Sequence, residues 1–125
     1  MTTSGSWFMS FDGLPPPLQP VPAGYSLRQF REGSVVRIEV RTNGGELAAR
    51  GFGAETSDAF IYDRIETDSR HRRRGLARAV MAELANARRS LSTAQLLVAT
   101  ADGERLYSSI GWRKLSAYST ACLPE

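Results

Sequence analysis

The chain of 125 residues contains a single cysteine, Cys122, and no apolar run that approaches the ~18 residues needed by a membrane-spanning helix. One cysteine cannot form a disulfide within the chain, and this is typical of proteins in a reducing cytoplasm. Residues 1–11 lack the basic start and the long apolar centre of a secretory signal. We therefore expect a cytoplasmic protein that has no membrane partner.

The rest of the composition is that of an ordinary globular protein. Apolar residues make up 42% of the chain and charged residues 23%, which argues against disorder. Prolines recur between Leu14 and Pro22 and exclude a helix there, so we expect a proline-rich, irregular lead-in over residues 1–23 and one folded domain over residues 24–125. The apolar residues from Trp7 to Phe11 have two interpretations. They cover an edge of the core or a partner, or they belong to a disordered leader.

An antiparallel meander is predicted over the first half of this domain. Apolar and polar residues alternate, and Val36, Ile38 and Val40 fall on one face of a strand. Asn43 and Gly44 favour a hairpin turn, because both tolerate a positive φ. With the short turns between them, the predicted strands span residues 25–31, 35–41, 46–55 and 59–67.

The period of the pattern changes in the second half. An apolar face with helical spacing predicts a helix from Leu76 to about Arg89, and the apolar run over residues 94–100 is typical of a strand buried on both faces. A short helix over residues 101–110 is expected to end at Gly111, followed by one or two strands over residues 112–123. This order predicts an α/β (α+β) fold with a mixed, mostly antiparallel central sheet and helices on its faces.

The charge distribution points to one anion site. The net charge is only +3, yet the loop before the predicted helix carries a cluster of arginines at positions 70, 72, 73, 74 and 78. A local cationic cluster indicates an anionic ligand rather than a nucleic-acid surface. The first turn of a helix also exposes unpaired N–H groups, and the small residues Gly75 and Ala77 leave the backbone open to phosphate oxygens. The alternative is a solvated basic loop whose glycine is needed for packing.

Two motifs in this order resemble the GNAT acetyltransferase superfamily. Its acetyl-coenzyme A signature stands here as Arg72-Arg73-Arg74-Gly75-Leu76-Ala77, and its helix with a tyrosine stands as Leu106-Tyr107-Ser108-Ser109-Ile110-Gly111-Trp112. The resemblance covers the chain from about residue 25 and implies a GNAT-like fold that binds acetyl-CoA and no metal. It implies that the cosubstrate contacts Ile65, Thr67, Arg72, Arg73, Arg74, Gly75, Leu76, Ala77, Arg78 and, at a position where many members carry asparagine, Thr100.

The same resemblance implies direct acetyl transfer to a primary amine, with Tyr107 protonating the departing thiolate. A backbone N–H near Thr67 is expected to stabilise the carbonyl oxygen. For the base, Glu66 ranks ahead of Asp63, and water is a third choice. A regular strand aims only one of the two acids at the cleft, unless a bulge intervenes. The alternative for both acids is pairing with arginines on a solvated sheet face, and for Tyr107 it is ordinary helix packing.

The sequence departs from the family at one place. Most members have two helices after the first strand that wall the acceptor site, whereas only Glu32, Gly33 and Ser34 separate the strands here. The acceptor, a small-molecule or peptide amine, therefore meets an open site or one completed by the N-terminal aromatics or a second copy of the chain. A non-catalytic acetyl-CoA-binding module is the alternative function. Nucleic-acid binding is the weakest of the three, because no aromatic residues interleave with the arginines.

Overall fold

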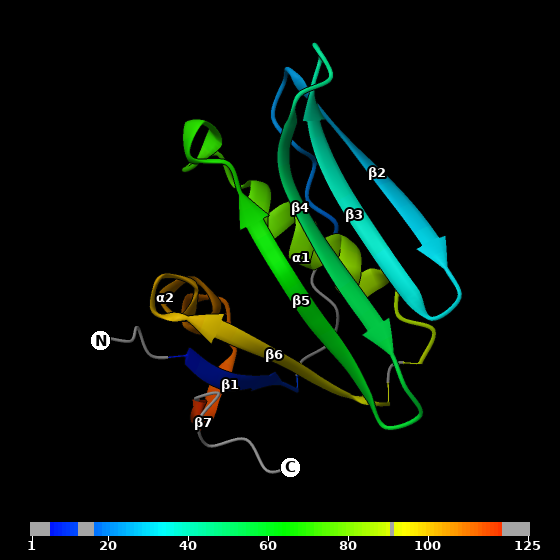
Figure 1. Ribbon diagram of the computed structural model, residues 1–125, viewed down its shortest axis with the longest axis vertical. Helices are drawn as coiled ribbons and strands as arrows, with labels where there is room; N and C mark the ends of the chain where they lie inside the picture. The colour runs from blue at the N-terminus through cyan, green and yellow to red at the C-terminus, as the bar shows by residue number, and fades with distance from the viewer. Residues whose placement is uncertain (1–5, 13–16, 91, 119–125) are drawn as a thin grey trace.

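The computed structural model describes residues 6–12, 17–90 and 92–118. In this part of the chain, strands form one sheet in the order β2-β3-β4-β5-β6-β1-β7 (Figure 1). The elements are β1 (Ser6–Phe11), β2 (Tyr25–Glu32), β3 (Val35–Thr42), β4 (Leu47–Glu55), β5 (Ala59–Thr67), the 3-10 helix η1 (Ser69–His71), α1 (Leu76–Asn86), β6 (Ala94–Thr100), α2 (Ala101–Ser109) and β7 (Arg113–Tyr118). Among the described strands only β5 and β6 pair in parallel, so the mixed, mostly antiparallel sheet predicted from the sequence is confirmed.

The meander from β2 to β5 forms as predicted. Short turns join the strands, and the one between β3 and β4 lies at Asn43 and Gly44. The side chains of Val36, Ile38 and Val40 are fully buried, while the residues between them face the other side of the sheet. We call the side that holds these three residues the inner face and the opposite side the outer face.

Two glycines in β4 allow close packing on the inner face. A Cβ at Gly51 would lie 2.7 Å from Cγ1 of Val80 in α1, and a Cβ at Gly53 would lie 2.2 Å from Cζ of Phe60. Both distances are too short for a side chain, since packed carbon atoms stay about 3.5–4.0 Å apart. The glycines that interrupt the predicted strand are therefore needed for packing.

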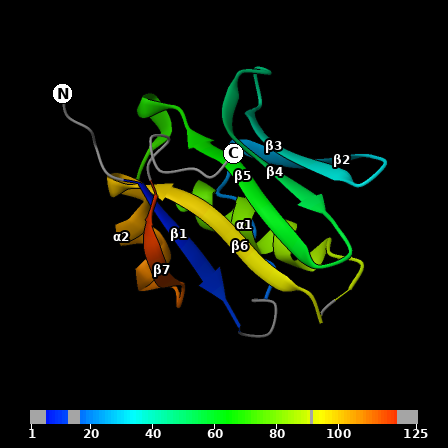
Figure 2. The same cartoon turned by 60° about the horizontal axis from the view of Figure 1, so that its bottom comes forward.

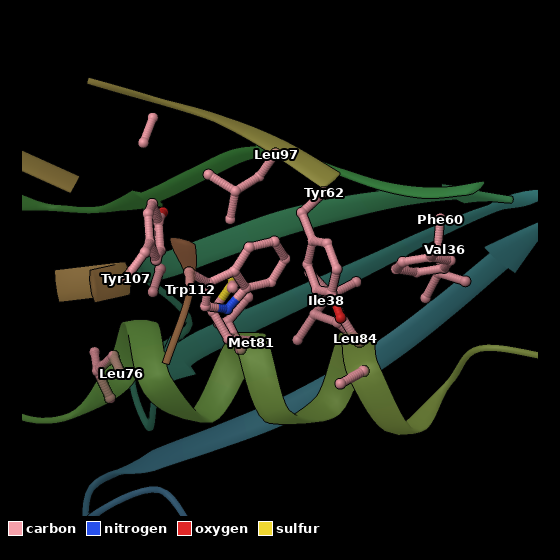
Figure 3. Packing of buried hydrophobic residues seen from close by; sticks show 14 of the residues in the cluster. Val36, Ile38, Phe60, Tyr62, Leu76, Met81, Leu84, Leu97, Tyr107 and Trp112 are labelled. Atoms are coloured by element: carbon pink, nitrogen blue, oxygen red, sulfur yellow. The ribbon is translucent and has the colours of Figure 1, made fainter. Parts of the chain in front are cut away.

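Helix α1 covers the inner face of β3, β4 and β5. Its apolar stripe is buried against the sheet, as Leu76, Met81 and Leu84 show in Figure 3. The helix ends at Asn86, somewhat before the predicted Arg89. Neither α1 nor α2 is long and apolar enough to span a bilayer.

The N-terminal apolar segment forms a strand inside the sheet. β1 lies antiparallel between β6 and β7 (Figure 2). Met9 is fully buried, and the ring of Phe11 stacks on Trp112 with 5.5 Å between centroids. The prediction of irregular structure was wrong for Ser6–Phe11, because the strands that pair with this segment come from the other end of the chain. Of the two interpretations, the one in which these residues cover the core is correct.

The prediction that β6 is buried on both faces was also wrong. Leu97 is buried on the inner face, whereas Val98 is 47% exposed on the outer face. Helices α1 and α2 both lie on the inner side of the sheet (Figure 2), and in the described part of the chain no helix covers the outer face. A final strand is confirmed as β7, and residues 119–125, with Cys122, lie outside the described part.

Candidate functional site

A groove of about 980 Å³ opens where α1 begins. It lies between the start of β4, the end of β5, the loop that follows β5, the first turn of α1 and one side of α2. Its described lining residues are Leu47–Arg50, Ile65–Asp68, His71–Arg73, Gly75–Arg78, Gly103, Leu106 and Tyr107. Small-molecule sites usually measure about 300–1,000 Å³, so this groove has room for a large ligand.

The segment Arg72–Gly75, which we call the arginine loop, leaves its backbone donors unpaired. Arg73 and Gly75 are left-handed, with φ of 65° and 77°, whereas Arg72 is extended, with a φ of −72° and a ψ of 161°. Successive N–H groups in a turn of this kind can form a concave anion-binding nest. Among the described residues, no acceptor receives a backbone N–H from Arg72 through Arg78. The loop and the first turn of α1 therefore offer a continuous set of free donors.

The arginine side chains around these donors are also unpaired. Arg72, Arg73, Arg74 and Arg78 have no carboxylate within 4.0 Å in the part of the chain that the structure describes. A cluster of guanidinium groups repels itself unless an anion lies among them. The geometry and the charge of this segment thus both favour a phosphate-bearing ligand.

The start of the arginine loop is held by η1. Asp68 accepts a hydrogen bond of 2.9 Å from the backbone N–H of Arg70, and Arg70 also pairs with Glu46. Hydrogen bonds from the Arg70 side chain lower the pKa of the Asp68 carboxyl to about 2. His71 contacts the Tyr25 hydroxyl at 2.7 Å through Nδ1. These contacts tie the loop to β2 and to the turn before β4.

Strands β5 and β6 are paired over only part of their length. The two strands pair only from Ala59 to Tyr62 on β5, and beyond that point they diverge, as Figure 1 shows. The end of β5 therefore has β4 on one side and, among the described strands, no partner on the other. Within this part of the chain, backbone groups of Ile65 and Thr67 thus lie at an unpaired strand edge beside the groove.

A bulge in β5 decides which way the candidate bases point. Phe52 of β4 faces Asp63, and Arg50 faces Glu66, so β5 has one residue more than β4 between these pairs. Arg64 takes up the extra length with a φ of 50°. Because residues directly opposite each other share a face, Asp63 and Glu66 both point to the outer face. β5 therefore contains the bulge that lets both acids share a face.

The two acids differ in their relation to the groove. Glu66 lines it and accepts a hydrogen bond from Arg50 Nε at 3.1 Å, whereas Asp63 is outside it and pairs with Arg64 at 3.2 Å. Both acids are thus paired with arginines on an exposed sheet face, as the alternative reading of these residues expected. Only Glu66 combines this pairing with a place in the groove.

Tyr107 reaches the groove from α2. Its side chain is 6% exposed, and its ring lies 6.4 Å from that of Trp112, measured between centroids (Figure 3). Burial raises the pKa of the Tyr107 hydroxyl to about 12, so the phenol keeps its proton at neutral pH. None of the described residues forms a hydrogen bond with this hydroxyl, which leaves it free to donate to a ligand.

Most predicted site residues come together in the groove, which Ile65, Glu66, Thr67, Arg72, Arg73, Gly75, Leu76, Ala77, Arg78 and Tyr107 all line. Asp63 and Arg74 are not among its lining residues. The side chain of Thr100, at the end of β6, lies outside the described part. No group of three or more His, Cys, Asp or Glu side chains among the described residues could hold a metal ion.

Arg50 and Gly103 also line the groove and were not predicted from the sequence. Gly103 lies one helical turn before Tyr107, so helical spacing from the tyrosine points to it. No pattern in the neighbouring sequence indicates that Arg50 lines the groove, because its position there depends on the register between β4 and β5.

Comparison with solved structures identifies the fold. A protein of the GNAT family from Novosphingobium aromaticivorans superposes with a TM-score of 0.65 at 21% identity, covering 91% of this chain and 61% of that protein. A GCN5-related N-acetyltransferase from Sphaerobacter thermophilus gives a TM-score of 0.72 at 18% identity, covering 91% and 49%. A GCN5-related N-acetyltransferase from Kribbella flavida gives 0.65 at 16%, covering 91% and 56%.

These similarities concern the fold, since identity is low throughout. The chain spans roughly half to three-fifths of the length of the structures it matches. No protein-family model and no curated protein matches the sequence.

Proposed function

We infer that this chain, which has the fold of the GNAT acetyltransferases, transfers an acetyl group from acetyl-CoA directly to a primary amine. One observation carries the proposal. A single groove joins the free donors of the arginine loop to Tyr107 on the inner side and to Glu66 on the outer side. A binding module for an anion alone has no need of the second and third groups.

The residues that are present suit acetyl-CoA. The unpaired N–H groups and the unpaired side chains of Arg72, Arg73 and Arg78 match a diphosphate, which takes charge-assisted hydrogen bonds. The free edge of β5 at Ile65 and Thr67 suits the amide groups of the pantetheine arm, in the manner of an added strand. Arg74 and Thr100 remain predicted contacts, with Arg74 outside the groove.

In the proposed reaction, the amine is deprotonated on the outer side of the sheet and the thiolate is protonated on the inner side. The amine must lose a proton before it attacks, and Glu66 or water takes that proton on the outer side. Attack forms the C–N bond and breaks the C–S bond, and the nitrogen releases its second proton to water as the amide forms. The thiolate takes the proton of the Tyr107 hydroxyl, which its raised pKa keeps in place until that step, and water returns a proton to the tyrosinate. Asp63 is the less favoured base, because it lies outside the groove.

Titration calorimetry with acetyl-CoA, followed by assays of thiol release with a panel of primary amines, tests the proposal. We expect binding and amine-dependent release. Binding of acetyl-CoA without thiol release in the presence of any amine would instead favour a non-catalytic module of the same fold. Absence of acetyl-CoA binding would contradict both functions. The cytoplasmic location and the second copy of the chain as a partner stay predictions.

A further inference from the structure

Two residues that line the groove form an ion pair between neighbouring strands. Arg50 of β4 and Glu66 of β5 lie directly opposite each other, and both line the groove. The side chains are 40% and 58% exposed. An exposed pair of this kind contributes little to stability, so both side chains can engage a ligand at the groove at little cost to the fold.

The pair is arranged so that each partner keeps free hydrogen-bonding capacity. Arg50 Nε and Nη2 approach the same carboxylate oxygen of Glu66, Oε1, at 3.1 and 3.0 Å. Among the described residues, no group binds Glu66 Oε2 or Arg50 Nη1. Glu39, which faces Arg50 from β3, is already paired with Arg37 and Arg41. A carboxylate acceptor and a guanidinium donor therefore stand side by side at the groove, each with an unused site.

We propose that the amine acceptor is a free α-amino acid or a close analogue, with its ammonium group on Glu66 and its carboxylate on Arg50. This rests on the proposed acetyl transfer and names the substrate class for it. In an α-amino acid a single carbon separates the two charged groups, which suits two protein groups that touch each other. The arginine fork is well matched to a carboxylate, and the acid that binds the ammonium also stands where its proton must go.

A peptide fits this pair less well. A peptide amino terminus or a lysine side chain carries no carboxylate beside its amine, so it engages Glu66 and leaves Arg50 without a new partner. Selectivity is strongest where a missing partner leaves a charged group unsatisfied. Arg50 is therefore expected to act as the specificity-determining residue.

The test compares each amino acid with its amide, for example alanine with alaninamide and phenylalanine with phenylalaninamide. The amide keeps the amine and the shape but loses the negative charge. For each variant we take the ratio of kcat/KM for the acid to kcat/KM for the amide, and then compare this ratio with that of the wild type. This second ratio cancels the different basicities of the two amines.

Arg50→Gln should lower the acid-to-amide ratio by roughly tenfold to a hundredfold, the value of a lost charge-assisted hydrogen bond. Arg50→Lys should restore part of it. Arg64→Gln is the matched control, because Arg64 also pairs with an acid on the outer face but lies outside the groove, and its ratio should not change. Calorimetry with alanine on the CoA-loaded protein should show the same loss of affinity in Arg50→Gln, without any turnover.

An unchanged ratio in Arg50→Gln, or a lysine peptide used better than any free amino acid, would overturn the amino-acid assignment and leave acetyl transfer intact. Failure to acetylate any amine would overturn the acetyl transfer itself and this inference with it. Circular dichroism of each variant checks that the fold is retained.

Discussion

Substituting Gly75 with glutamate is a direct test of the anion site. An added Cβ at Gly75 would meet no atom within 4 Å, so the new side chain enters open space and displaces no part of the protein. The φ of 77° makes any residue with a Cβ strained there, at about 1–2 kcal/mol. For a chain of this size, 1 kcal/mol lowers Tm by about 3–5 °C. The variant should therefore fold, with a modest loss of stability.

In Gly75→Glu, the loss of affinity for acetyl-CoA should come mainly from charge repulsion and not from the backbone strain. A carboxylate at ~5 Å from a diphosphate with two negative charges costs about 1.7 kcal/mol even in bulk water, and more where solvent is excluded. We therefore expect the Kd for acetyl-CoA to rise at least roughly tenfold in Gly75→Glu. Gly75→Gln has nearly the same size and strain without the charge, so it should retain more of the affinity.

Gly33→Glu provides the control. Gly33 has a φ of 62°, open space around it, and a place in the turn between β2 and β3, away from the groove. It adds the same charge to the whole chain and the same kind of strain. Calorimetric titration should show wild-type affinity for Gly33→Glu. If Gly75→Glu keeps the wild-type Kd, or if Gly33→Glu loses as much affinity, the arginine loop is not the diphosphate site.

Three further predictions concern single side chains. In a thiol-release assay, Tyr107→Phe should lower kcat by roughly 10²-fold or more, while the Kd for acetyl-CoA stays unchanged. In the wild type, kcat should not fall through tyrosine deprotonation below about pH 11, because burial raises the pKa of Tyr107 to about 12. Gly53→Ala should destabilise the fold by about 1–3 kcal/mol in urea unfolding, because its Cβ would lie 2.2 Å from Phe60, and an unchanged midpoint would contradict this packing. Asp68→Asn should be less stable than the wild type at neutral pH but not near pH 2. Hydrogen bonds from Arg70 lower the Asp68 pKa from 3.8 to about 2, so the stabilisation is present above pH 4 and is lost as pH falls through 2.

The parts of the fold that depend on residues close together in the sequence were predictable from it. The alternation of Val36, Ile38 and Val40 is a local pattern, and burial of these three residues follows from it once the sheet has one covered face. The position of β1 was not predictable in this way. Its neighbours β6 and β7 lie at the opposite end of the chain, and the prolines that follow β1 hide the strand within an irregular-looking segment.

The candidate site was predictable to a similar extent. The segment from Arg72 to Ala77 and Tyr107 are recognisable motifs, and the structure brings them to one groove. The register of β5 had to be known before Glu66 could be distinguished from Asp63 as the candidate base. No glycine marks the bulge in the sequence, because the left-handed residue there is Arg64. Arg50 could be found only after that register was known.

The bulge at Arg64 explains why one groove serves both sides of the sheet. If the same residues formed a regular strand, alternation would place Glu66 on the inner face, opposite to Asp63 and away from Arg50. With the bulge, Glu66 turns to the uncovered outer face, just past the point where β5 leaves β6. A ligand held by the arginine loop on the inner side can then meet an amine that approaches from the outer side. The bulge thus orients the candidate base and, under the proposed function, keeps the amine and the cosubstrate on opposite sides of the sheet.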